Sequence, residues 1–161
     1  EKDWKEGLYL VDKLKSYTWI LPLLWMGIIF FFSHQPGDES AELSGGITQF
    51  LLMVLEGVNI PLDQAALHGI IRTMAHFTIF FILGYLWYIS LRFRDVSPGY
   101  SATIAFVLCV AYAFFDEAHQ YFVPGRACEL KDVMVDSIGA GCAILIGRLL
   151  SALRQKAFIK I

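Results

Sequence analysis

Four apolar stretches constrain this chain more than any other feature of its sequence. They cover residues 17–33, 76–91, 100–115 and 133–150. Each is about 15 to 18 residues long, close to the roughly 20 residues that a helix needs to cross the hydrocarbon of a bilayer. Of the 161 residues, 57% are hydrophobic and only 17% are charged, which is unlike a soluble domain of this size. We therefore predict an all-α integral membrane protein, a four-helix bundle that forms a single domain over residues 1–161.

The first stretch could also be a cleavable signal peptide. No small-residue cleavage site follows Phe32, however, where the chain continues Ser-His-Gln-Pro. We interpret residues 17–33 as a retained span.

The positions of Lys and Arg predict the orientation, because loops rich in these residues tend to stay in the cytoplasm. Ten of the thirteen lie before the first span, between spans two and three, or at and after the end of the fourth span. The other three are Arg72, Arg126 and Lys131. An even number of spans puts both termini on the same side. We therefore expect a multi-pass protein of the cell membrane with both termini in the cytoplasm.

The first outer loop has a helical pattern of its own. Apolar residues recur with a 3.6-residue period over residues 47–58, which predicts an amphipathic helix on the bundle or in the membrane interface. Asn59-Ile60-Pro61 then resembles a helix start that continues into the second span. In the fourth span, Gly139, Ala143 and Gly147 recur every four residues and should let a neighbouring helix approach closely.

Polar residues gather where the predicted spans meet the outer surface. Three of the four histidines lie at this level, with an acidic segment after the third span and two aspartates at the start of the fourth. Ionisable groups at membrane depth usually face a bundle interior or a wet cavity and mark function. We predict an outward-facing pocket with catalytic candidates His76, Asp116, Glu117 and His119, and anion- or substrate-binding candidates His34, Arg72, Gln120, Arg126, Asp132 and Asp136.

In this pocket the arginines would hold a phosphate or carboxylate, and His76 or His119, oriented by Asp116 or Glu117, would transfer protons. Each of these residues could instead have a purely structural role. The aspartates of the fourth span could pair with Arg126 and Lys131 and stabilise the start of their helix. His34 could do no more than end the first span, and His68 is interpreted as an ordinary surface histidine. The cluster after the third span could be a structural ion-pair network.

Other kinds of site find less support. A three-ligand zinc site could draw on the histidines and carboxylates, but there is no HExxH motif, and the chain from Asp116 to His119 lacks a histidine pair at helical spacing. The three cysteines have no CxxC spacing, and no serine lies in a G-x-S-x-G elbow. We predict no metal and no other cofactor. A net charge of −2 without a basic run argues against a nucleic-acid partner.

The motifs together resemble those of the VanZ-like family. They are Ser33-His34-Gln35-Pro36, Arg72-x-x-x-His76-Phe77 with Gly84-Tyr85, Asp116-Glu117-x-His119-Gln120, Pro124-Gly125-Arg126 and Asp132-x-x-x-Asp136-x-x-Gly139. That family usually has Lys where Arg72 stands and Asn where Asp136 stands. The resemblance implies a multi-helix membrane protein, linked in some members to glycopeptide (teicoplanin) resistance, and it implies no established reaction.

Three functions remain open, and the first is favoured. The protein could act on or bind an anionic cell-envelope group, lipid-linked or related to peptidoglycan. It could instead be a non-catalytic protein that binds the drug or a wall precursor, or a membrane partner of another protein. Transport ranks last, because the inner halves of the spans carry mainly Leu, Ile, Phe and Trp. Membrane lipids are the expected partners, with an envelope precursor or glycopeptide as ligand, and the sequence predicts neither an oligomeric state nor whether the protein is an enzyme.

Overall fold

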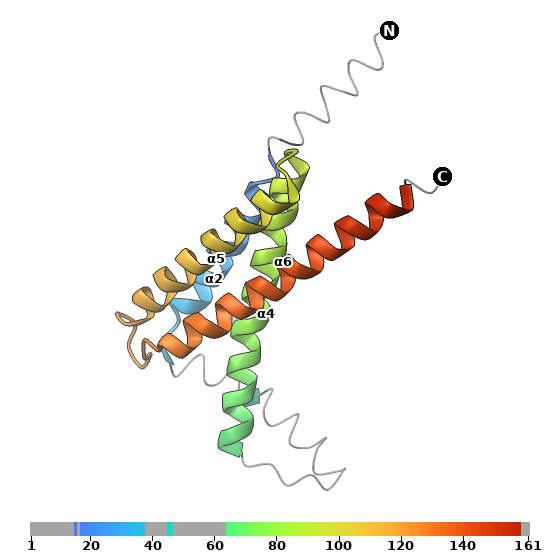
Figure 1. The fold of residues 1–161 in the computed structure, drawn as a ribbon. Coiled ribbons are helices and arrows are strands. Elements are labelled where there is room, and N and C mark those ends of the chain that lie inside the picture. Colours follow the sequence, from blue (N-terminus) through green and yellow to red (C-terminus); the bar gives the residue numbers. More distant parts are fainter. Residues whose placement is uncertain (1–14, 16, 38–44, 47–63, 159–161) are drawn as a thin grey trace, which may run out of the picture.

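The computed structural model describes residues 15, 17–37, 45–46 and 64–158, and Figure 1 shows their path. Four helices make up most of this part of the chain: α2 (Ile20–Ser33), α4 (Gln64–Phe93), α5 (Pro98–Gln120) and α6 (Leu130–Phe158). No strand occurs among the described residues, which confirms the all-α prediction. The amphipathic helix predicted over 47–58 and the helix start at 59–61 lie outside the described residues.

The helices are longer than the apolar stretches of the sequence. Those over Ala66–Phe93, Pro98–Gln120 and Leu130–Leu153 are long and apolar enough to cross a membrane, whereas α2 is a shorter apolar helix of 14 residues. α4 begins at Gln64 rather than near His76, and α5 continues to Gln120. The apolar stretches are short because polar outer turns belong to the same helices and interrupt the hydrophobic pattern.

The turn between α4 and α5 defines one end of the bundle. α5 begins at Pro98, a residue suited to the first helical position because the backbone there needs no N–H donor. In the turn, Asp95 adopts a left-handed conformation with φ of 61°. Its carboxylate lies 2.7 Å from Nζ of Lys15, just before α2. The start of α2 and the end of α6 therefore point toward the same end of the bundle as this turn (Figure 1).

Glycines allow α4 and α6 to cross closely. A Cβ atom added to Gly84 of α4 would lie 2.7 Å from the backbone oxygen of Ala140 in α6. In the other direction, Cβ atoms added to Gly139 and Gly147 would collide with the backbone of Phe77 and with the ring of Tyr88. The predicted role of the small residues of the fourth span in close helix packing is confirmed.

An apolar core fills the middle of the bundle and includes Ile29, Phe80, Leu83, Cys109, Ala113 and Ala140. Two hydrogen bonds attach the short α2 to its neighbours across this core. Trp25 Nε1 donates to the backbone oxygen of Ile79 at 2.8 Å, and the Tyr112 hydroxyl donates to that of Met26 at 2.6 Å. These bonds fix the position of α2, whose C-terminal end contributes to the polar region described next.

Candidate functional site

Buried polar side chains concentrate where α2 and α5 end and α6 begins. Seven of them expose 7% of their surface or less: Ser33, His76, Asp116, Glu117, Gln120, Asp132 and Asp136. Helical spacing explains part of the grouping, because residues four apart share a helix face. Charged groups in such a place are stable only when hydrogen bonds or opposite charges compensate for lost hydration. The partners of each group therefore describe the site.

The first set of partners joins the ends of α2 and α5. Oδ2 of Asp116 accepts hydrogen bonds from the Ser33 hydroxyl and from Nε2 of Gln120, both at 3.0 Å. The other oxygen of Asp116, Oδ1, is buried and has no hydrogen-bond partner among the described residues. Asp116 thus positions the last turn of α2. The sequence predicted that Asp116 would orient a histidine, but its hydrogen bonds go to Ser33 and Gln120 instead.

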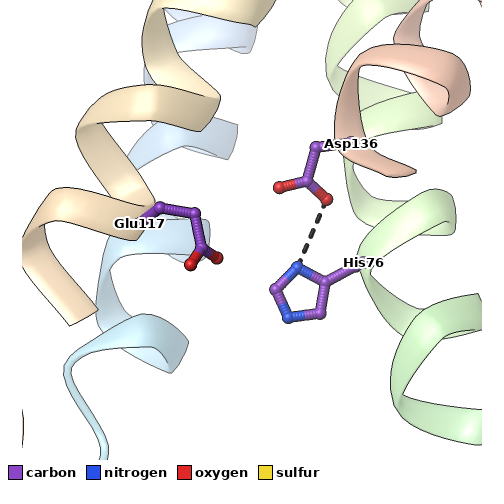
Figure 2. Close-up of side chains that lie close together, drawn as sticks. All are labelled: His76, Glu117 and Asp136. Carbon is purple, nitrogen blue, oxygen red and sulfur yellow. Dashed lines mark hydrogen bonds and ion pairs between the residues drawn. The ribbon is translucent and has the colours of Figure 1, made fainter. Parts of the chain in front are cut away.

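The second set joins three helices around His76 (Figure 2). Nδ1 of His76 in α4 lies 3.2 Å from Oδ1 of Asp136 in α6. Glu117 of α5 faces this pair, and its Oε2 accepts a 2.9 Å hydrogen bond from the backbone N–H of Glu129. Asp136, and not Asp116 or Glu117, is therefore the carboxylate that orients His76.

One donor atom from each of His76, Glu117 and Asp136 lies within 4.8 Å of the other two. Oε1 of Glu117 and Oδ2 of Asp136 are buried, and neither has a hydrogen-bond partner in the part of the chain that the structure describes. An imidazole and two carboxylates from three different helices thus converge on one point.

The two arginines already have partners within the protein. Arg72 Nη2 lies 3.1 Å from Oδ2 of Asp132, while Arg126 donates to the backbone oxygens of Gln35 and Phe32 at 3.2 and 3.0 Å. Burial and the nearby Arg72 both lower the pKa of Arg126 from its usual high value. A guanidinium has five N–H donors, so each arginine keeps donors for a ligand.

These partners differ from the alternative pairing considered above, in which the aspartates of the fourth span bind Arg126 and Lys131. Lys131 instead pairs with Glu129 at 2.8 Å, on the surface.

A cavity of about 300 Å³ opens beside these groups, mainly between α2 and α4. Its polar lining comes from Ser33, Gln35, His68, Arg72, His76, Gln120 and Arg126. Its apolar wall includes Trp25, Ile28, Ile29, Phe32, Ile71 and Ile79. A cavity with one polar end and one apolar wall is suited to an amphiphilic ligand.

Of the ten predicted site residues, four line the cavity and six do not, namely His34, Asp116, Glu117, His119, Asp132 and Asp136. His34 and His119 form a pair of their own, with His34 Nδ1 3.2 Å from His119 Nε2 and their rings stacked. The ring of His119 also contacts that of Phe30, with centroids 4.5 Å apart. Neither histidine is among the residues that line the cavity. His76 therefore lines the cavity without His119.

One residue that lines the cavity was not predicted from the sequence to belong to the site. His68 was interpreted as an ordinary surface histidine, and it lines the cavity. The signal was the helical spacing of His68, Arg72 and His76, which follow one another at intervals of four residues and so share one face of α4. The break in hydrophobicity before residue 76 concealed that face.

Comparison with protein families bears on all of these residues. The family model for VanZ/LLP1 matches residues 18–151. The chain belongs to that family. The match covers every candidate site residue, from His34 to Asp136, and confirms the resemblance based on the motifs. A search of curated proteins and a search of solved structures each found no match. The family, together with three helices capable of spanning a bilayer, identifies a VanZ/LLP1 membrane protein.

Proposed function

We propose that this VanZ/LLP1 protein binds the anionic head of a cell-envelope molecule, such as a lipid-linked or peptidoglycan-related phosphate or carboxylate, at the outer surface of the cell membrane. The observation that carries the proposal is the cavity, in which Arg72 and Arg126 both line the polar end. Arginine binds carboxylate and phosphate through paired N–H donors. The two guanidiniums are also close enough for Arg72 to lower the pKa of Arg126, so an anion between them would relieve their repulsion.

The apolar wall supports a ligand with a lipid tail. Ile28 and Phe32 of α2 both line the cavity, yet they expose 43% and 46% of their surface. Such residues border the cavity and also face the outside of the bundle, where lipid surrounds a membrane helix. An acyl or polyprenyl chain could therefore lie along this side while the anionic head reaches the arginines. The cytoplasmic location of both termini, which places the cavity outside, is part of the same proposal.

Native mass spectrometry of protein purified in mild detergent tests the binding. The wild type should retain a phosphate- or carboxylate-bearing envelope lipid, and Arg126→Ala should lose at least about nine-tenths of it, because a charge-assisted pair of hydrogen bonds is removed. Arg148→Ala is the matched control, since Arg148 is an exposed arginine near the other end of α6. Equal lipid in wild type and Arg126→Ala, or no bound lipid in any sample, would overturn the proposal.

A second experiment separates chemistry from binding alone. In a catalytic form of this function His76 is the acid–base candidate, because it lines the cavity and Asp136 orients it. His76→Gln should then abolish conversion of the bound lipid while its binding persists. If the protein only binds, cells that express His76→Gln should tolerate teicoplanin as well as cells that express the wild type, at equal protein levels.

A further inference from the structure

We propose that His76, Glu117 and Asp136 form a binding site for one divalent transition-metal ion such as Zn²⁺. The donors come from α4, α5 and α6, and Figure 2 shows the side chains of His76, Glu117 and Asp136 pointing toward one another from these helices. One imidazole nitrogen and two carboxylate oxygens form a donor set that zinc and its neighbours in the first transition row accept readily.

The unpartnered oxygens are the first argument. Glu117 exposes 2% of its surface and Asp136 none, yet Oε1 of one and Oδ2 of the other lack a partner among the described residues. A buried carboxylate oxygen without a hydrogen bond is strongly disfavoured, and this cluster contains two. A cation between them would satisfy both oxygens at once.

The net charge is the second argument. Among the described residues of this region, four buried carboxyl groups belong to Asp116, Glu117, Asp132 and Asp136. Among the described residues, the cations near these groups are Lys131, which already pairs with Glu129 on the surface, and the guanidiniums of Arg72 and Arg126. With the carboxyl groups ionised and the imidazoles neutral, two negative charges remain uncompensated. One divalent ion would balance them, which a single additional hydrogen bond would not.

The geometry is the third argument. Three atoms within 4.8 Å of one another share a centre no more than about 2.8 Å from each, and zinc–oxygen and zinc–nitrogen distances are about 2.1 Å. An inward movement of under about 1 Å, which side-chain rotation supplies, would complete the site. The hydrogen bond from the Glu129 N–H to Oε2 of Glu117 already leaves Oε1 available and restrains the carboxylate, as outer hydrogen bonds do for metal ligands.

Three protein ligands leave a coordination position free, as in zinc sites that bind a substrate. His76 lines the cavity, so this position lies next to the space where the arginines would hold an anion. With a metal bound, His76 is a ligand and not the proton carrier. The metal would then bind an oxygen of the same anionic head.

The sequence did not predict this site, because it has no pair of histidines at the spacing that puts two ligands on one helix. The three ligands instead lie on three helices, and only the folded structure brings them together.

Metal analysis of purified protein tests the inference. The protein, free of any affinity tag, is stripped with a chelator in detergent, loaded with Zn²⁺, Mn²⁺ or Co²⁺, and freed of excess metal before its metal content is measured. For one of these ions the wild type should retain about one ion per chain, and Glu117→Gln and Asp136→Asn should retain less than about a tenth of that. These substitutions keep the size of the side chain and remove its charge.

Two controls exclude other metal sites. The paired His34 and His119 could bind zinc on the surface, so the double variant His34→Gln/His119→Gln is measured in parallel and should retain the metal. The variant Asp132→Asn changes a buried carboxyl group that is not one of the three proposed ligands, and it should also retain the metal. Metal retained by Glu117→Gln and Asp136→Asn as by the wild type would overturn the inference, as would a wild type that retains none of the three ions.

If a variant does not fold, the inference can still be tested by measuring the unfolding temperature of the wild type with and without each metal ion. The ion that is retained should raise the unfolding temperature, because a ligand that binds only the folded state stabilises it, whereas Mg²⁺ should not. No rise with any of the three ions would overturn the inference. These measurements use no lipid, and the lipid test uses Arg126→Ala, so the metal site and the anion-binding function can fail separately.

Discussion

The two ends of the bundle use ion pairs in opposite ways. At the end formed by the α4–α5 turn, Lys15 and Asp95 make a short contact on the surface, where the Asp95 side chain is 79% exposed. At the other end, His76 and Asp136 form a longer contact of 3.2 Å in which Asp136 has no exposed surface. Water and salt screen the first pair, whereas burial leaves the second much less screened. The comparison indicates that burial, and not distance, determines how much stability is lost when such a pair is broken.

The largest effect should follow from breaking the buried pair. Asp136→Ala leaves the buried imidazole of His76 without its hydrogen-bond partner, and we expect the free energy of unfolding to fall by about 2 kcal/mol. Denaturant titration in detergent, followed by circular dichroism, measures the change. Asp136→Asn, which retains a hydrogen-bond acceptor, should lose less. An Asp136→Ala variant as stable as the wild type would remove the contrast between the two ends.

A smaller effect should follow where the buried carboxylate keeps another partner. Ser33→Ala removes one of the two donors to Oδ2 of Asp116, while Gln120 remains. We expect a loss of about 1 kcal/mol, the usual net contribution of one hydrogen bond. The same titration measures it. Ser101 is a buried serine of α5 close to the opposite end of the bundle, so Ser101→Ala makes the same side-chain change there. An equal loss of stability in both variants would show that the polar cluster contributes no more than an ordinary buried serine.

The smallest effect should follow at the exposed end. Asp95→Asn removes the charge but keeps a residue that tolerates the left-handed backbone, so the unfolding temperature at neutral pH should not change measurably. Lys15 holds the pKa of Asp95 below its usual range, so the contribution of this pair is present at neutral pH and is lost as the pH falls through that lowered pKa. Unfolding temperatures of wild type and Asp95→Asn in low and high salt test this. A clear loss of stability would contradict the screening argument.

The sequence predicted the helices well, and it placed the polar residues at one end. Apolar runs of sufficient length specify helices in lipid, because no other open structure satisfies the backbone there. The spacing of Asp116 and Gln120, four residues apart in α5, correctly anticipated their shared face, and they are hydrogen-bonded. Local periodicity is enough for such features.

Partners across helices were not predictable in the same way. The orientation of His76 was assigned to the acidic pair of α5, yet Asp136 of α6 provides it. Of the two histidines predicted for the pocket, His76 lines the cavity, and His119 instead contacts His34 and Phe30. These pairings depend on the rotation of each helix about its axis, which the close α4–α6 crossing at Gly84 and Gly139 determines. A single sequence carries no direct record of that rotation.

The length of α4 has a consequence for where a ligand would be found. A helix of 30 residues is about 45 Å long, whereas the hydrocarbon layer of a bilayer is about 30 Å thick. If the apolar part of α4 lies in the hydrocarbon, its first turns would lie among the lipid headgroups, with Arg72 near the depth of their phosphates. A lipid-anchored molecule would then reach the guanidinium by lateral diffusion alone, without leaving its own leaflet.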